Sequence, residues 1–142
     1  MKVRTSLHAR AKITYPSIRF RIDFGSKSGV GPGKIALLEQ LEYCGSLSQA
    51  ARNLNMSYRR AWQLLESLNS SFVEPLVLTS TGGRGGGGAK LTLLGERLIH
   101  VYRAFDVRIQ ARATQWFGPF KPDVRKKARA AKTRSVVSVR AR

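Results

Sequence analysis

The chain has 142 residues, which is enough for one domain with its own core but not for two sizeable ones. It carries 26 Lys and Arg against 8 Asp and Glu, a net charge of +18, so the expected partner is a polyanion, with nucleic acid ahead of an anionic membrane surface. A single cysteine excludes an intrachain disulfide and a cysteine-based metal cluster, and no segment is apolar enough for a signal peptide or a bilayer span. We therefore expect a cytoplasmic, nucleoid-associated protein without a membrane partner, in which Cys44 is a buried, inert thiol.

The charge is unevenly distributed along the chain. Residues 1–14 contain four cations and no acid, and residues 121–142 contain nine cations and one acid. These patterns predict a basic N-terminal arm and a basic, disordered C-terminal tail. Phosphate contacts from such segments raise the affinity for nucleic acid without selecting a base sequence.

The first predicted element is a strand. Residues 17–24, SIRFRIDF, place an apolar side chain at every second position, and this period of two is typical of a half-buried strand. A turn-rich connector follows over 25–33. Pro32 suits the first turn of a helix that continues through KIALLEQLEYC, and Gly45 ends that helix.

Two helices separated by a tight break come next. Ser46 and Gln49 form a capping-box pattern at the start of the first helix, whose apolar face is narrow because it consists mainly of alanine. The chain breaks at 55–56, and Ser57 can cap a further helix over 57–72. A short alanine-faced helix, a tight turn and a second capped helix indicate a helix-turn-helix.

Two short strands are predicted at 75–80 and 89–93, joined by a loop with six glycines among residues 82–88. A glycine loop between strands that follow the third helix is typical of a wing whose backbone approaches a partner closely. GRGGGG also fits the pattern G-x-G-x-x-G, but any glycine run does, and a dinucleotide site needs a helix that opens inside the motif. A phosphate-binding loop is excluded because Ala89 stands where lysine is required.

From Thr92, a good N-cap, a long helix is predicted over LLGERLIHVYRAFDVRIQARA. Its first turns belong to the core, but little of the domain remains to cover its later apolar positions. We therefore predict that Tyr102, Phe105 and Ile109 pack against the same helix of a second copy, which gives a homodimer. WFGPF, 116–120, extends this apolar seam.

The predicted fold class is mainly α with a small β part (α+β). A winged helix-turn-helix occupies 15–92 and includes the N-terminal strand, and a long dimerisation helix with an aromatic end occupies 93–120.

The outward face of the third helix is the candidate probe for duplex DNA, because the major groove of B-form DNA admits one helix. Arginine can bind guanine with two hydrogen bonds, and glutamine can bind adenine in the same way. The alternative is an ordinary solvated polar face. Trp62 is interpreted as a structural prop between the second and third helices, with a DNA contact as the alternative. The DNA-contacting residues predicted on this helix are Ser57, Tyr58, Arg59, Arg60 and Gln63.

Contacts to the sugar-phosphate backbone are predicted around this helix. The free N–H groups at the start of the second helix attract phosphate, although Ser46 could act as a cap alone. In the wing, Arg84 is the one long side chain of the glycine loop, and narrow minor grooves attract arginine. Lys90 adds a contact from the hairpin stem. The predicted contacts at the second helix are Ser46, Ser48 and Gln49, with a weaker one from Lys34 at the first helix.

Residues 45–69, GSLSQAARNLNMSYRRAWQLLESLN, and 81–102, TGGRGGGGAKLTLLGERLIHVY, strongly resemble the N-terminal DNA-binding domain of the ModE family. These are molybdate-responsive transcription regulators related to LysR-type helix-turn-helix proteins, and the resemblance covers about residues 32–112. It implies a regulator, and a dimer of this kind would bind a pseudo-palindromic operator. Full-length members carry C-terminal oxyanion-binding domains, whereas this chain has no such core after the long helix. We therefore expect a stand-alone DNA-binding domain with no molybdate site and no cofactor.

An enzyme is not expected, because His8 falls in the basic arm, His100 in the long helix, and the sequence offers no paired carboxylates, activated serine or metal-ligand set. The main alternative is a sequence-indifferent nucleoid or RNA-binding protein, since a charge of +18 does not choose among polyanions. A protein-interaction module that uses the wing or the long helix is the third reading.

Overall fold

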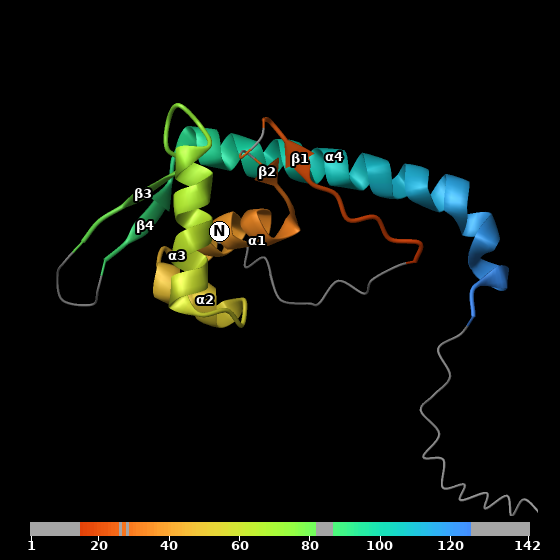
Figure 1. The fold of residues 1–142 in the computed structure, drawn as a ribbon, viewed down its shortest axis with the longest axis horizontal. Coiled ribbons are helices and arrows are strands. Elements are labelled where there is room, and N and C mark those ends of the chain that lie inside the picture. Colours follow the sequence, from red (N-terminus) through yellow and green to blue (C-terminus); the bar gives the residue numbers. More distant parts are fainter. Residues whose placement is uncertain (1–14, 26, 28, 82–86, 126–142) are drawn as a thin grey trace, which may run out of the picture.

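The computed structural model describes residues 15–25, 27, 29–81 and 87–125, which form four α-helices, a 3₁₀-helix and two short antiparallel hairpins (Figure 1). The helices are α1 (Pro32–Cys44), α2 (Leu47–Asn53), α3 (Tyr58–Ser70), α4 (Leu93–Phe117) and the 3₁₀-helix η1 (Gly118–Asp123). Strand β1 (Ile22–Asp23) pairs with β2 (Gly29–Val30), and β3 (Val77–Thr79) pairs with β4 (Ala89–Leu91). The predicted fold class, mainly α with a small β part and a winged helix-turn-helix, is confirmed.

Helix α1 is the centre of the core. It buries side chains on more than one face because α2, α3, α4 and β4 all pack around it, and none of the buried residues in the described chain is polar or charged. Gly45 ends α1 with a left-handed φ of 65°, and its N–H donates to the Leu41 carbonyl oxygen at 2.8 Å, so the predicted C-cap is confirmed. The fully buried residues of this helix are Ile35, Leu37, Leu38 and Leu41.

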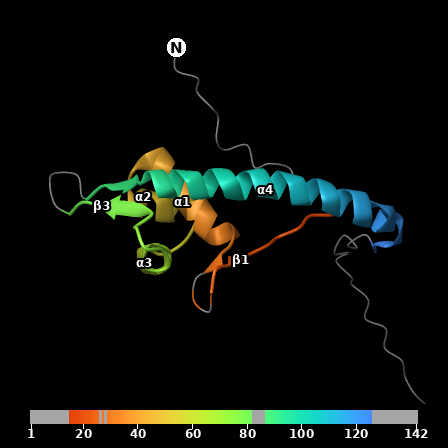
Figure 2. The same cartoon turned by 90° about the horizontal axis from the view of Figure 1, so that it is seen from above.

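Helix α4 starts in the core and continues well beyond it. Thr92 caps the helix by accepting a hydrogen bond from the N–H of Gly95 at 3.2 Å. Gly95 lies against the carbonyl of Leu76, and a Cβ added there would overlap that oxygen, so this position requires glycine. Both views place the β3–β4 hairpin at one end of the molecule and the far end of α4 at the other (Figures 1 and 2).

The prediction of a strand over residues 17–24 is mostly wrong. Only Ile22 and Asp23 pair with another strand, because β2 is just two residues long and offers no further partner. Residues 17–21 are extended but bond to the side of α4 instead: Gln110 accepts a hydrogen bond from the Ile18 N–H at 3.0 Å and donates one to the Pro16 carbonyl at 2.6 Å. We call residues 15–24 the strap, since they run along α4 (Figures 1 and 2).

The C-terminal elements extend further than expected. Helix α4 reaches Phe117, and η1 continues to Asp123, so part of the tail predicted from 121 is helical. Trp116, Phe117 and Phe120 are all more than half exposed at this end. The predicted arm at 1–14 and the rest of the tail, 126–142, lie outside the described residues.

Candidate nucleic-acid interface

Helix α3 presents two chemically distinct faces. Ser57 caps its start by accepting a hydrogen bond from the Arg60 N–H at 3.1 Å, as predicted. Ala61, Leu65 and Leu68 are buried at the predicted spacings of four and three residues, which fixes the rotation of the helix about its axis.

The opposite face of α3 is open to solvent. The predicted DNA-contacting side chains Arg59, Arg60 and Gln63 are exposed, and none of them makes a side-chain hydrogen bond or ion pair within the described part of the chain. Tyr58 is exposed as well. The role of Trp62 as a prop between α2 and α3 stays a prediction; 45% of its surface is accessible. Two guanidinium groups, an amide and two aromatic rings therefore occupy one accessible surface over the first two turns.

Helix α2 is held close to α3 by small side chains. Ala50 and Ala51 of α2 and Ala61 of α3 are buried, so the two backbones can approach closely. Between the helices Asn55 adopts a φ of 54°, a left-handed conformation that asparagine tolerates, and the Met56 N–H donates to the Ala51 carbonyl at 3.0 Å. The tight break predicted at 55–56 is thus the turn of the helix-turn-helix.

The three phosphate ligands predicted at the start of α2 have different surroundings. Ser46 is the N-cap and accepts a hydrogen bond from the Gln49 N–H at 3.2 Å. The Gln49 side chain donates to Asn53 and accepts from Arg52, so it is tied to its own helix. Ser48 is exposed. The cap uses the Gln49 N–H, and the N–H groups of Leu47 and Ser48 have no partner within the helix.

The β3–β4 hairpin forms the wing beside α3 (Figure 1). Beyond the three paired positions, the Ser80 N–H donates to the Gly88 carbonyl at 2.9 Å, and the Gly88 N–H donates back to the Ser80 hydroxyl at 3.1 Å. The hairpin therefore continues toward the glycine loop. Lys90 is exposed on β4, whereas Arg84 lies outside the described residues.

Two contacts attach the wing to the helix-turn-helix. The Ala89 N–H donates to the Gly45 carbonyl at 2.9 Å, which joins β4 to the turn between α1 and α2. On the other strand, the Asn69 side chain makes three hydrogen bonds with the main chain of Leu76 and Val77. Sequence analysis missed Asn69, although a carboxamide among apolar positions at the last turn of a helix is the pattern that could have revealed it.

Lys34 makes two contacts within the domain. Its ammonium donates to the Gly29 carbonyl at 2.7 Å and to the Ser67 hydroxyl at 2.8 Å, which links β2, α1 and α3. Partial burial lowers the pKa of this amine, and the nearby charges of Arg21 and Arg60 lower it further. The weak phosphate contact predicted for Lys34 stays a prediction, since two of the three donors of its half-buried ammonium are used within the domain.

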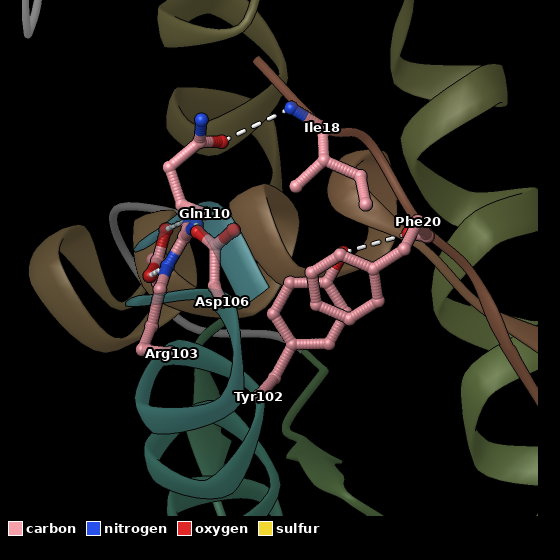
Figure 3. A network of polar contacts seen from close by, with 7 residues as sticks. Ile18, Phe20, Tyr102, Arg103, Asp106 and Gln110 are labelled. Atoms are coloured by element: carbon pink, nitrogen blue, oxygen red, sulfur yellow. Dashed lines mark hydrogen bonds and ion pairs between the residues drawn. The ribbon is translucent and has the colours of Figure 1, made fainter. Parts of the chain in front are cut away.

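The residues predicted for dimerisation divide into two groups. The prediction that Tyr102 packs against a second copy is wrong, because Tyr102 is buried within its own chain. Its ring stacks on that of Phe20 with the ring centres 4.5 Å apart, and its hydroxyl donates to the Phe20 carbonyl at 2.9 Å (Figure 3). The strap covers this turn of α4, which composition alone did not reveal. Phe105 remains 44% exposed, and Ile109 is partly exposed one turn further along.

An ion-pair network fixes α4 to α1 just beside this contact. Arg103 on α4 donates to both carboxylate oxygens of Glu39 on α1, at 2.5 and 2.7 Å, and to Asp106 at 3.3 Å (Figure 3). The hydrogen bond to Glu39 raises the pKa of the Arg103 guanidinium. The two-point contact sets the direction in which α4 leaves the core.

Among the described residues, no helix combines the length and the apolar character needed to cross a bilayer.

Comparisons with known proteins agree with this geometry. Residues 33–96 match the family model for the bacterial regulatory helix-turn-helix protein of the lysR family. Similar proteins include the transcriptional regulator ModE of Yersinia pestis, 49% identical over 71 residues that cover 50% of this chain and 27% of the relative. The ModE of Haemophilus influenzae is 42% identical over 73 residues, 51% of this chain and 29% of the relative.

The Escherichia coli K12 protein described as a DNA-binding transcriptional dual regulator, ModE, is 42% identical over 84 residues, which cover 54% of this chain and 32% of the relative. The matched region thus spans about a third or less of each of these relatives. The family-model match, residues 33–96, includes the helix-turn-helix, both strands of the wing and the first turn of α4. Residues 33–96 therefore form a helix-turn-helix domain that is similar to the lysR family and to part of the ModE regulators.

Proposed function

We propose that the protein is a transcription regulator that binds a pseudo-palindromic operator as a homodimer, with α3 in the major groove and the glycine wing on the adjacent backbone or minor groove. The DNA-binding domain is the part on which this proposal depends. The regulatory role, the dimer and the individual contacts are inferences from the geometry and from the likeness to ModE regulators.

The observation that carries the proposal is the exposed face at the start of α3. Arg59, Arg60 and Gln63 project from it without a side-chain partner among the described residues, and the acid nearest to them on this helix, Glu66, comes only in its third turn. Arginine and glutamine are the side chains that bind purine edges with paired hydrogen bonds. Such a surface favours a groove of duplex DNA over a solvated helix face.

The wing and the start of α2 supply sequence-independent contacts. Lys90 is exposed on the hairpin stem, and half-buried Ser46 and exposed Ser48 stand at the start of α2. Arg84, at the tip of the glycine loop, is assigned to the minor groove on sequence grounds alone. These groups would fix the register of α3 on the duplex.

Apolar surface on α4 supports the dimer. Together with the strap and β2, the helix borders an entirely apolar hollow of about 240 Å³, whose rim includes Phe24, Val101 and Phe105. All three side chains are substantially exposed in the single chain. A second copy would cover this surface and place two α3 helices at a fixed spacing, as a palindromic site requires.

Selection of binding sites from random duplexes with the full chain tests the proposal. We expect an enriched motif with two-fold symmetry, bound more tightly than random duplex or RNA throughout a salt series. Arg59→Ala should weaken binding to the selected duplex by about 1–3 kcal/mol and relax its preference at one base position. The matched control is Arg112→Ala, which removes an exposed arginine from the distal part of α4.

Equal binding of selected duplex, random duplex and RNA would contradict sequence-specific regulation. That result would favour the alternative of a sequence-indifferent nucleoid or RNA-binding protein, for which the net charge of +18 suffices. A regulator would act on the nucleoid in the cytoplasm, and that localisation belongs to the same proposal.

A further inference from the structure

The geometry points to Asn69 as the residue that positions the wing against the recognition helix, and thereby as a determinant of DNA affinity that does not itself touch DNA. This inference rests on the proposed function and names a further residue that acts in it. Asn69 lies in the last turn of α3, about two and a half turns beyond Arg60. Its side chain points toward the wing rather than to solvent.

The three hydrogen bonds of Asn69 resemble strand pairing. The Asn69 Oδ1 atom accepts from the N–H of Leu76 at 2.9 Å and from the N–H of Val77 at 3.1 Å. The Nδ2 atom donates to the Val77 carbonyl at 2.9 Å. A carboxamide that bonds both the N–H and the C=O of one strand residue occupies the place that a third strand would take at the edge of β3.

The other edge of β3 is occupied by β4. The Thr92 N–H donates to the Leu76 carbonyl at 2.9 Å, and Val77 lies opposite Leu91 in the hairpin register. Because main-chain groups alternate between the two edges of a strand, Val77 turns its N–H and C=O away from β4. Asn69 satisfies both groups, so the side chain joins α3 and β3 at the root of the wing.

The connection between α3 and β3 cannot perform this role by itself. Residues 71–76 contain no regular element, and Val73 within them is fully exposed. The Pro75 carbonyl accepts a hydrogen bond from the Thr92 hydroxyl at 2.9 Å, which ties this segment to the start of α4 rather than to α3. Buried Leu76 and Val77 hold the root of the wing in the core, but apolar packing is not directional, whereas the bonds to Asn69 fix an orientation.

The consequence concerns the two DNA-contacting elements together. A helix and a wing can engage one duplex at the same time only if their relative placement matches its grooves, and a small misplacement costs affinity. Asn69 can contribute to that placement but not to base readout, because three of the four hydrogen-bonding positions of its amide are already used internally. It is a positioning residue.

The experiment uses the full chain, the duplex obtained by site selection and random duplex of the same length. Asn69→Ala should weaken binding to the selected duplex about tenfold at a temperature where circular dichroism shows the variant folded, which corresponds to the loss of one wing contact. In an Arg84→Ala background the further loss should be smaller than tenfold, since of the two wing contacts only that of Lys90 remains to be positioned. In an Arg59→Ala background it should cause the full tenfold loss.

Ser70→Ala is the matched control. Ser70 is the next residue of α3, is exposed, and makes one local hydrogen bond to the Ser67 carbonyl. It should bind the selected duplex as the parent does. If Asn69→Ala does not fold, Asn69→Asp retains both acceptor bonds and loses only the donor to Val77. Its binding is then compared with that of Ser70→Asp, which adds the same charge one residue away.

Each outcome decides a different point. Unchanged binding by folded Asn69→Ala, or an equal loss in the parent and Arg84→Ala backgrounds, overturns the positioning role and leaves Asn69 as a residue of stability alone. For the aspartate pair, a deficit no greater than that of Ser70→Asp has the same meaning. If the parent chain itself does not distinguish selected from random duplex, the proposed function fails, and this result is recognisable before any variant is made.

Discussion

The head of the molecule and its shaft are held together by different interactions. The head, made of α1, α2, α3 and the wing, encloses a core of fully buried leucine, isoleucine, valine and alanine side chains with no buried polar group among the described residues. The shaft, made of α4 from Val101 onward with the strap beside it, depends on a few directed contacts. Gln110 and Tyr102 bond to the strap main chain, and Phe20 stacks on Tyr102 (Figure 3).

This difference has consequences for cooperativity. Apolar burial in the head is shared among many side chains, so loss of one weakens every element that packs on α1. No side chain of the strap is fully buried, so the strap should open in a local step below the free energy of global unfolding. The surface available to a second copy therefore depends on whether the strap is in place, because Phe20 also contacts Phe105 edge-on at 5.2 Å.

The largest effect is expected in the head. Leu38→Ala removes a fully buried side chain from α1, and such truncations lower the free energy of unfolding by about 2–5 kcal/mol. Denaturant titration followed by circular dichroism measures the change. Leu93→Ala is the control, since Leu93 is 83% exposed and its truncation should change stability by no more than about 0.5 kcal/mol. Equal shifts for the two variants would mean that α1 is not the centre of the core.

A smaller and local effect is expected in the strap. Phe20→Ala removes a half-buried ring together with its contacts to Tyr102 and Phe105, which should destabilise the strap by roughly 2 kcal/mol, below the value for a fully buried ring. Trypsin should then cleave faster after Arg19 and Arg21. The denaturant midpoint for unfolding of the head should fall less than it does in Leu38→Ala. Tyr15→Ala, at an exposed strap residue, serves as the control. A midpoint that falls as far as in Leu38→Ala would show that strap and head unfold as one unit.

The features that sequence predicted correctly are local ones. Ser46, Ser57 and Thr92 cap the helices that follow them, and Gly45 ends the helix before it, because each cap depends on residues within one turn. The apolar periodicity of α3 likewise fixed which side is buried. The same periodicity left Arg59 on the exposed side, which is the basis of the candidate DNA surface.

The features that it missed are contacts between distant segments. Tyr102 and Phe20 are separated by 82 residues, and Gln110 and Pro16 by 94, so no local pattern indicates that the strap covers α4. The alternation within residues 17–24 reveals an apolar side but not its partner. Asn69 was overlooked for the same reason, since its role is visible only when β3 is in place.

Lys34 stands at the junction of the two regions and gives the smallest predicted effect. Its ammonium joins β2, the strand that pairs with β1 of the strap, to Ser67 on α3. Burial, followed by the charges of Arg21 and Arg60, lowers the pKa of its amine below the ordinary value of 10.5. Because the group is only partly removed from water, solvent screening keeps the associated energy small.

The sign of the pH dependence follows from that shift. Between the lowered pKa of the folded state and 10.5, the unfolded chain binds more protons at Lys34 than the folded chain, so this residue's contribution to the free energy of unfolding rises as pH increases through that window. Denaturant titrations of the parent chain and Lys34→Met from about pH 8 to pH 11 isolate the contribution of Lys34 to the free energy of unfolding. The titration of all other groups cancels in the difference between the two proteins. Parent stability relative to the variant should increase with pH. A decrease would mean that the hydrogen bonds to Gly29 and Ser67 favour the ammonium form strongly enough to outweigh its burial. The positive charge of Lys34 would then stabilise the junction instead of weakening it.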